Sequence, residues 1–161
     1  MSQAKRYQLD DTDWHIIREL QADARMSYAE LGRRIGMSSP AVQERVRRLE
    51  DAGIIEGYQA KINYPKIGLP LLALTRLIDV DSRDIEAVNQ ILHANPQVVS
   101  AHHVTGEDEY HIQVVGITIA DIKRVLYQLK QHCNTTTSFV IETTINNRPI
   151  TQDLLEELEN A

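Results

Sequence analysis

Apolar residues recur at helical spacing in three short stretches near the start of the chain. The first predicted helix follows Asp10, which can cap it, and carries Ile16 and Leu20 on its apolar side. The second and third helices are predicted over residues 28–35 and 40–51. Each is amphipathic, so the three predict a small helical domain.

The turn between the second and third predicted helices is short. Gly36 suits a helix end that needs a left-handed residue, and either Ser38 or Ser39 can cap the next helix. The apolar residues of that helix, from Val42 to Leu49, recur at i, i+4 and i+7 and therefore share one face. Two helices joined by such a turn are typical of a helix-turn-helix.

The pattern changes at residue 54. Residues 54–64 are predicted to be extended and end at Pro65 and Gly68, and we interpret them as a linker that can hold a strand of its own. Strand and helix patterns then alternate in the order β-α-β-β-α-β. The strands are predicted over residues 71–80, 97–105, 110–116 and 135–145, and the helices around residues 85–92 and 122–129. This order is typical of a ferredoxin-like fold, with both helices on one face of an antiparallel sheet.

These elements predict an α+β protein with three parts. A helix-turn-helix (winged-helix-like) domain is expected over residues 1–53, an extended linker over residues 54–68 and a ferredoxin-like βαββαβ domain over residues 69–161. The first strand has apolar residues at both parities, Leu72 and Leu77 among them, as expected when both faces of a sheet are buried. Because the helices cover only one face, the other is predicted to pack against a second subunit.

Length and composition are ordinary for a soluble globular protein, with 161 residues of which 42% are apolar and 25% charged. No apolar run approaches the roughly 18 residues that a membrane span needs, and the N-terminus lacks the apolar stretch of a secretory signal. The single cysteine, Cys133, cannot form an internal disulfide, and we interpret it as a free thiol rather than a nucleophile. A cytoplasmic location is therefore expected.

The charges are divided unevenly along the chain, whose formal net charge is −6. Residues 1–60 carry nine Lys or Arg against ten Asp or Glu, and residues 61–161 carry eight against thirteen. Within residues 25–48, however, six arginines stand against two glutamates. Such a concentration of positive charge in an acidic protein favours binding to the phosphates of nucleic acid. A structural helix pair with a solvated polar face is the alternative.

Residues 9–68 resemble the N-terminal half of the Lrp/AsnC family of bacterial and archaeal transcription regulators. The motifs that carry the resemblance are DARMS at residues 23–27, SSPAV at residues 38–42 and RVRRLEDAGII at residues 45–55. The sequence VTGEDEY, at residues 104–110, resembles the effector-domain motif of the family. The resemblance covers nearly the whole chain and implies a sequence-specific regulator of transcription.

The resemblance also implies an assembly and a ligand. Members of this family dimerise through their C-terminal sheets and commonly assemble into octamers. A small effector, usually an amino acid, binds between dimers near the glycine-containing turn and changes assembly and DNA affinity. Double-stranded DNA and further copies of this chain are therefore the expected partners, with no cofactor besides the effector.

The third predicted helix is the recognition helix that the resemblance implies. Its groove-facing part comprises Ser38, Ser39, Pro40, Gln43, Glu44 and Arg47. Of these, Ser39, Gln43 and Arg47 are expected to reach base edges, because arginine pairs with guanine and glutamine with adenine. The side chains expected to contact phosphates are Tyr28, Arg33, Ser38, Arg45 and Arg48. For Arg45, an ion pair with Glu44 or Glu50 is the alternative.

The effector site that the resemblance implies lies at the turn between the second and third strands. The family pattern there is Gly, two variable residues and Asp, and this chain has Gly106, Glu107, Asp108 and Glu109. Glu109 takes the acidic position, unless Asp108 does so through a different turn, and a carboxylate there can accept bonds from an α-amino group. The expected lining comprises Thr105, residues 106–109, Thr135 and Thr137. The alternative is a hairpin turn with solvated carboxylates.

Two histidines, His102 and His111, are predicted to lie on one face of the sheet if Thr105 pairs with Tyr110. They can begin a metal site, but the sequence offers no third ligand, so no metal is expected. The chain has no Gly-rich phosphate loop, G-x-S-x-G elbow or H-E-x-x-H motif, and we predict no catalytic residues and no enzymatic activity. Two alternatives stay open: an enzyme of the siroheme-decarboxylase type, which resembles this family, and an architectural DNA-binding protein.

Overall fold

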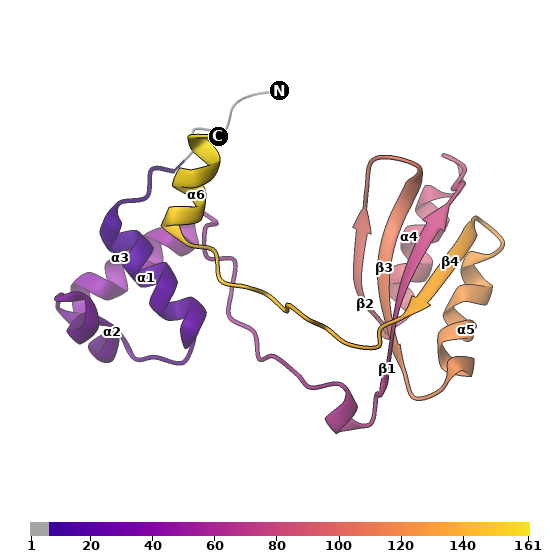
Figure 1. Ribbon diagram of the computed structural model, residues 1–161, viewed down its shortest axis with the longest axis horizontal. Helices are drawn as coiled ribbons and strands as arrows, with labels where there is room; N and C mark the ends of the chain where they lie inside the picture. The colour runs from indigo at the N-terminus through magenta and orange to yellow at the C-terminus, as the bar shows by residue number, and fades with distance from the viewer. Residues whose placement is uncertain (1–6) are drawn as a thin grey trace. The chain divides into compact units, whose positions relative to one another are not determined.

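The computed structural model describes residues 7–161, and the chain divides into two compact units (Figure 1). The first unit contains the chain up to Ala60 together with Ile145–Ala161, and the second contains Lys61–Thr144. The C-terminal segment therefore belongs with the helix-turn-helix, and not with the ferredoxin-like domain to which the sequence assigned it. None of the described helices is long and apolar enough to span a membrane.

Three helices begin the first unit: α1 at Asp11–Ala22, α2 at Tyr28–Ile35 and α3 at Ser39–Asp51. Each follows a residue whose side chain caps it. Asp10 accepts a hydrogen bond from the backbone N–H of Asp13 at 2.8 Å, and Asp13 accepts one in return from the N–H of Asp10 at 3.2 Å. The hydroxyls of Ser27 and Ser38 cap α2 and α3. These local bonds explain why the helices begin where the sequence predicts.

The turn between α2 and α3 depends on two glycines. Gly36 ends α2 in the left-handed conformation, with a φ of 73°. Gly32 lies against the turn, because a Cβ atom there would come within 2.4 Å of the carbonyl oxygen of Met37. The core that joins the three helices consists of Ile16, Leu20, Leu31, Val42, Val46 and Leu49. This core fixes which face of α3 is exposed.

The chain after α3 has little regular structure before residue 71. Gly53 turns it with a φ of 68°. Residues 54–64 form no strand, so the linker has no strand of its own, and a short 3₁₀ helix follows at Pro65–Ile67. Between residues 7 and 70 the regular elements are all helical, so no wing hairpin follows α3 there.

The second unit is a four-stranded antiparallel sheet with two helices on one face (Figure 1). Its elements are β1 at Leu71–Ile78, α4 at Ile85–Ala94, β2 at Val98–His103, β3 at Asp108–Gly116, α5 at Ile119–Leu129 and β4 at Asn134–Phe139. The strand order is β2-β3-β1-β4, which is that of a ferredoxin-like fold. The predicted α+β fold class is confirmed.

Alternate residues of β1 face opposite sides of this sheet. Ala73, Thr75 and Leu77 are buried on the side that the helices cover. Leu74 and Arg76 lie on the other side, where Leu74 is 46% exposed. The face that the sequence predicts to be buried by a second subunit is therefore open in the single chain.

The last strand is shorter than predicted, and an unpredicted helix follows it. β4 ends at Phe139, which pairs with Ala73, rather than at residue 145. The helix α6 spans Gln152–Glu159 and belongs to the first unit. Gln21 of α1 binds the segment that precedes α6. Its Nε2 donates to the carbonyl oxygen of Ile150, and its Oε1 accepts from the N–H of Ile150, both at 2.9 Å.

The pairing between β2 and β3 also differs from the prediction. Tyr110 pairs with His103, two residues before the predicted partner. The connection between the strands covers residues 104–107, two positions earlier than predicted, and it holds Gly106 at a φ of 124°, which a side chain would strain. Since the shift is by an even number of residues, His102 still shares a face with His111, but now lies directly opposite it.

Candidate nucleic-acid interface and effector site

One row of exposed polar side chains runs along α3 beside its stripe of buried residues. Ser39, Gln43 and Arg47 are exposed and recur at i, i+4 and i+8, so they lie along one line of the helix. Pro40 is exposed in the first turn, and Ser38 uses its hydroxyl to cap the helix. The side chains predicted to contact bases are therefore accessible from solvent.

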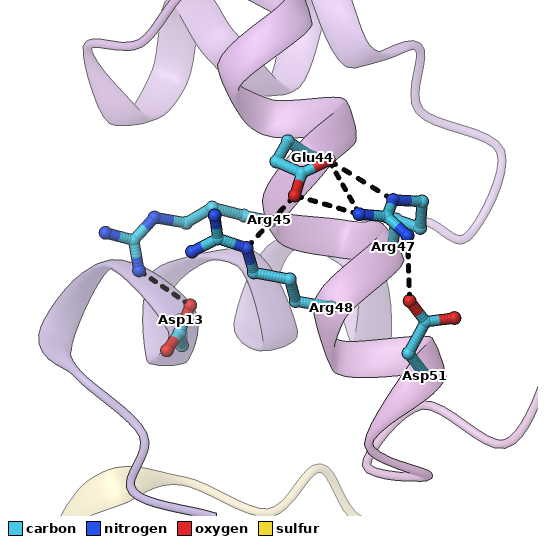
Figure 2. Close-up of polar contacts among 6 residues, drawn as sticks. All are labelled: Asp13, Glu44, Arg45, Arg47, Arg48 and Asp51. Carbon is cyan, nitrogen blue, oxygen red and sulfur yellow. Dashed lines mark hydrogen bonds and ion pairs between the residues drawn. The ribbon is translucent and has the colours of Figure 1, made fainter.

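Arg47 and Arg48 share the carboxylate of Glu44 (Figure 2). Arg47 donates from Nε to Oε2 at 3.2 Å and from Nη2 to Oε1 at 3.0 Å, and Arg48 donates from Nε to Oε1 at 3.1 Å. A further bond runs from Nη1 of Arg47 to Oδ2 of Asp51 at 3.0 Å. The hydrogen bonds from Arg47, and next those from Arg48, hold the pKa of Glu44 below its usual range. Glu44 is therefore charged at neutral pH.

Arg45 binds α1 instead (Figure 2). Its Nη1 donates to Oδ2 of Asp10 at 2.6 Å and to Oδ1 of Asp13 at 2.9 Å. The side chain of Arg45 is 30% exposed and that of Asp13 is 5% exposed. The hydrogen bond from Arg45 is the main cause that lowers the pKa of Asp10. The ion pair that the sequence left open for Arg45 is thus present, but with Asp10 and Asp13 rather than Glu44 or Glu50.

Most of the positive charge of residues 25–48 is paired within the protein. Arg33 forms an ion pair with Glu30, and Arg34 donates to Glu30 at 3.1 Å and to Glu19 at 2.8 Å. With the three arginines of α3, five of the six arginines in this stretch have a carboxylate partner. Several of these carboxylates lie outside the stretch, so charges counted along the sequence overestimate the free positive charge.

Tyr28 is half-buried and lines a hollow of about 250 Å³ together with Leu20, Met26 and Tyr58. The hydroxyl of Tyr58 donates to Oε1 of Glu50 at 3.0 Å. Burial, and next this hydrogen bond, raise the pKa of Tyr58 to about 12, so the phenol stays neutral near pH 7. A phosphate contact by Tyr28 would be made from the rim of this hollow.

The predicted effector turn carries two carboxylates in different surroundings. Asp108 accepts hydrogen bonds from Nε2 of His111 at 2.8 Å and from Nη1 of Arg76 at 3.4 Å. The bond from His111, and next the charge of Arg76, lower the pKa of Asp108. Oε2 of Glu109, by contrast, is buried and has no hydrogen-bond partner among residues 7–161. Glu109 therefore presents an unsatisfied acceptor at the acidic position of the turn.

Cys133 lies near Glu109 on the helix-covered side of the sheet. Its thiol is buried and donates to the carbonyl oxygen of Leu129 at 3.4 Å. Burial, followed by the charges of Glu109 and Asp84, raises the pKa of Cys133 to about 11. A protonated, buried thiol is a poor nucleophile, which agrees with its interpretation from the sequence.

The threonines predicted to line the effector site lie two strands away from the turn. Leu77 of β1 stands between the start of β3 and Thr135 of β4, which corresponds to roughly 10 Å across the sheet. The hydroxyl of Thr137 is hydrogen-bonded to that of Thr75 at 2.9 Å. The structure thus brings residues 105–109 together, with residues 105–107 in the connection and Asp108 and Glu109 at the start of β3. Thr135 lies near the same end of the sheet, and Thr137 lies in the middle of β4.

The two facing histidines each have a protein partner. Nε2 of His102 is hydrogen-bonded to the hydroxyl of Ser100 at 2.8 Å, and Nε2 of His111 is bonded to Asp108. No group of three or more His, Cys, Asp or Glu side chains in the described part of the chain is arranged to hold a metal ion. These contacts give both imidazoles a structural explanation.

Comparison with known proteins supplies the family. The model of the AsnC-type helix-turn-helix domain matches residues 9–50, and that of the Lrp/AsnC ligand binding domain matches residues 76–150. The HTH-type transcriptional regulator LrpA of Mycobacterium tuberculosis is 37% identical over 137 residues, which cover 85% of this chain and 89% of that protein. The chain belongs to the Lrp/AsnC family. The regulatory protein AsnC of Haemophilus influenzae, another member, is 32% identical over 120 residues, covering 74% of this chain and 80% of that protein.

Solved structures resemble this Lrp/AsnC protein over most of its length. A transcriptional regulator of Neisseria meningitidis in complex with L-methionine has a TM-score of 0.83 and 27% identity, covering 92% of this chain and 99% of that chain. The feast or famine regulatory protein of M. tuberculosis, also in complex with L-methionine, has a TM-score of 0.80 and 32% identity, covering 88% and 97%. The family resemblance seen in the sequence is confirmed, and the chain is a helix-turn-helix transcriptional regulator.

A hollow between α4 and β2 of this Lrp/AsnC protein has no counterpart in the sequence predictions. Its volume is about 460 Å³, and His93 and His103 are among the residues that line it. The ring of His103 stacks on Tyr110 with centroids 4.7 Å apart, and the hydroxyl of Tyr110 donates to Asn89 at 3.1 Å. The register of β2 and β3 pairs His103 with Tyr110, and this register differs from the one predicted from the sequence.

Proposed function

We propose that this protein regulates transcription by placing α3 in the major groove of DNA, with Ser39, Gln43 and Arg47 toward the base edges. The exposed row that these three residues form is the observation that carries the proposal. Arginine and glutamine suit bidentate contacts to guanine and adenine. The core beneath the row and the cap at the start of α3 hold it rigidly, as base recognition requires.

The phosphate contacts are assigned from exposure and from existing partners. Arg33 and Arg48 are exposed and each has one carboxylate partner, so both keep N–H donors for phosphate. Phosphate contacts are proposed for Ser38 and Tyr28 as well. Arg45 is assigned a structural role instead, because its guanidinium already ties α3 to α1.

An amino-acid effector is proposed to bind at the turn that contains Gly106 and Glu109. Its α-ammonium group would donate to Oε2 of Glu109, which is buried and lacks a partner in the described chain. Backbone N–H groups near Gly106 would hold its carboxylate. Asp108 is less suited to this role, since Arg76 and His111 already bind it. Two relatives were solved with L-methionine, which makes methionine the first amino acid to test.

The open face of the sheet is the proposed dimer interface, because Leu74 is exposed there in the single chain. A dimer carries two copies of α3. The half-sites of its operator are therefore expected about 34 Å, or a multiple of that distance, apart. Further assembly of dimers, to octamers as in the family, is part of the same proposal.

The test of DNA recognition begins with selection of a binding sequence from a library of random duplexes. Fluorescence anisotropy then compares the selected duplex with a scrambled one, and a specific regulator should bind the selected duplex at least about 1,000-fold more tightly. Arg47→Ala should weaken binding to the selected duplex by about 5- to 150-fold and leave the scrambled duplex nearly unchanged. Arg33→Ala, the control, should weaken both equally. Equal wild-type affinity for the two duplexes would instead indicate an architectural DNA-binding protein.

The effector proposal is tested by light scattering and DNA titration with L-methionine and the other nineteen amino acids. The wild-type protein should change its mass or its DNA affinity with at least one of them. Glu109→Gln should remove this response and keep the DNA affinity measured without effector. Asp108→Asn is the matched control and should keep the response. The opposite result, loss in Asp108→Asn alone, would transfer the acidic role to Asp108.

A further inference from the structure

Glu44 contacts both arginines of α3 that face solvent (Figure 2). The side chains of Arg47 and Arg48 are 60% and 61% exposed. Arg47 binds Glu44 side-on, through Nε and Nη2, and binds Asp51 through Nη1. Nη2 lies 3.0 Å from Oε1 and 3.1 Å from Oε2 of Glu44, and we take this as one N–H shared between the two oxygens of one carboxylate. Because a guanidinium has five N–H donors, these bonds then leave one donor on each Nη nitrogen of Arg47.

The two donors that remain on Arg47 match the edge of one base. Guanine presents O6 and N7 side by side in the major groove, and both are acceptors. With its Nε side held by Glu44, Arg47 has lost much of the freedom to swing toward the DNA backbone. A phosphate can be reached by any N–H of a mobile arginine, whereas guanine needs two donors in one orientation. The bond to Glu44 therefore favours base contact over backbone contact.

The charge of α3 leads to the same conclusion. The helix has three arginines and three carboxylates, those of Glu44, Glu50 and Asp51, and so has no net charge. When a nonspecific phosphate takes Arg47 from Glu44, one charge-assisted bond replaces another. The released carboxylate of Glu44 is then left facing the phosphates, which repel it. At a guanine, by contrast, Arg47 keeps Glu44 and gains two bonds to the base.

We infer that Glu44 is a specificity-determining residue of the DNA complex: it aims Arg47 at guanine and holds Arg47 away from nonspecific phosphates. The inference rests on the DNA binding proposed above. Glu44 lowers the affinity for random DNA more than the affinity for the operator, so that specificity arises partly by exclusion of the wrong partner.

Glu44→Gln tests this role, because it removes the charge and keeps the size of the side chain. Glu50→Gln is the matched control, since it removes the same charge from the same helix while Glu50 bonds to Tyr58 rather than to an arginine. Both variants and the wild-type protein are titrated with the selected and the scrambled duplex over a series of NaCl concentrations. Urea unfolding of each variant verifies that the fold is kept.

Relative to Glu50→Gln, Glu44→Gln should bind the scrambled duplex about two- to fivefold more tightly. The slope of log affinity against log salt should steepen by about 0.9, for the one phosphate contact that Arg47 gains. Affinity for the selected duplex should stay or fall, so the specificity ratio decreases. Equal behaviour of the two variants on both duplexes, or an unchanged slope, overturns the inference. A wild-type protein that does not distinguish the duplexes overturns the proposed function itself, which keeps the two failures apart.

Discussion

Arg45→Ala is expected to destabilise the helix-turn-helix unit rather than to remove a contact with DNA. Nη1 of Arg45 lies 2.6 Å from Asp10 and 2.9 Å from Asp13, whose side chain is 5% exposed. Without the guanidinium, Asp13 keeps one hydrogen bond, from the backbone N–H of Asp10 at 3.2 Å. Its negative charge then stays buried at the start of α1 without an ion-pair partner.

The size of the expected loss in stability depends on how far the ion pair of Arg45 and Asp13 is exposed to water. Loss of one partner from a fully buried ion pair costs about 3–5 kcal/mol, and an exposed pair is worth about 0–1 kcal/mol. Arg45 is 30% exposed and Asp13 nearly buried, so the free energy of unfolding should fall by about 1–3 kcal/mol. The positive end of the α1 dipole still stabilises Asp13, which keeps the loss below the fully buried case. The thermal midpoint should fall by roughly 4–8 °C for each kcal/mol.

The single tryptophan makes the measurement specific for this unit. Trp14 is half-buried in the first turn of α1, so its fluorescence during urea unfolding reports on the helix-turn-helix. Arg48→Ala is the matched control, because it removes an arginine of the same helix whose partner, Glu44, lies at the surface. Its urea midpoint should equal that of the wild type. The DNA titration should affect the other variant: Arg48→Ala should bind scrambled DNA more weakly than the wild type, and folded Arg45→Ala should bind it with wild-type affinity.

An unchanged urea midpoint for Arg45→Ala would refute this assignment. The refutation would be complete if the variant also bound scrambled DNA more weakly and with a shallower salt dependence. Arg45 would then be the phosphate contact that the sequence predicts, and its bonds to Asp10 and Asp13 would contribute little to the stability of the unit.

Two further measurements test the ferredoxin-like unit. Burial, followed by nearby carboxylates, raises the pKa of Cys133 to about 11. A thiol reagent at pH 8 should therefore label Cys133 in the folded protein about 100-fold more slowly than in the unfolded chain. Equal labelling rates would contradict this. Because folding raises this pKa, its contribution to stability is complete below pH 9.0 and is lost as the pH rises toward about 11; Cys133→Ala should remove that loss. Leu74→Glu should convert a dimer to monomers in light scattering, since the new charge would be buried in the interface; an unchanged mass would place the interface elsewhere.

The helices of the DNA-binding unit could be predicted because their ends depend on near neighbours in the sequence. Asp10 and Ser38 cap α1 and α3 through bonds to residues three positions away, and Gly36 ends α2 by its own backbone conformation. The exposure of the row on α3 followed from the helical period alone, since Val42 and Leu49 determine the buried face beside it.

The remaining features depend on residues far apart in the sequence. β4 ends where its ladder with β1 ends, at Phe139, although the residues beyond it have high strand propensity. The helix α6 is short, and Gln21 holds the segment before it from 129 positions away. Likewise, Asp10 pairs with Arg45 across 35 positions, so the number of free arginines could not be read from local charge.

The contact between Gln21 and Ile150 has a consequence for how the DNA-binding unit is attached. The polypeptide passes between the two units twice, once after Ala60 and once after Thr144. Two covalent tethers restrict the swivelling of a unit more than one does, so a dimer gives up less orientational freedom when both copies of α3 engage one duplex. A fluorophore attached at Ala161 would accordingly report on the unit that holds α3, although the chain reaches this residue from the last strand of the sheet.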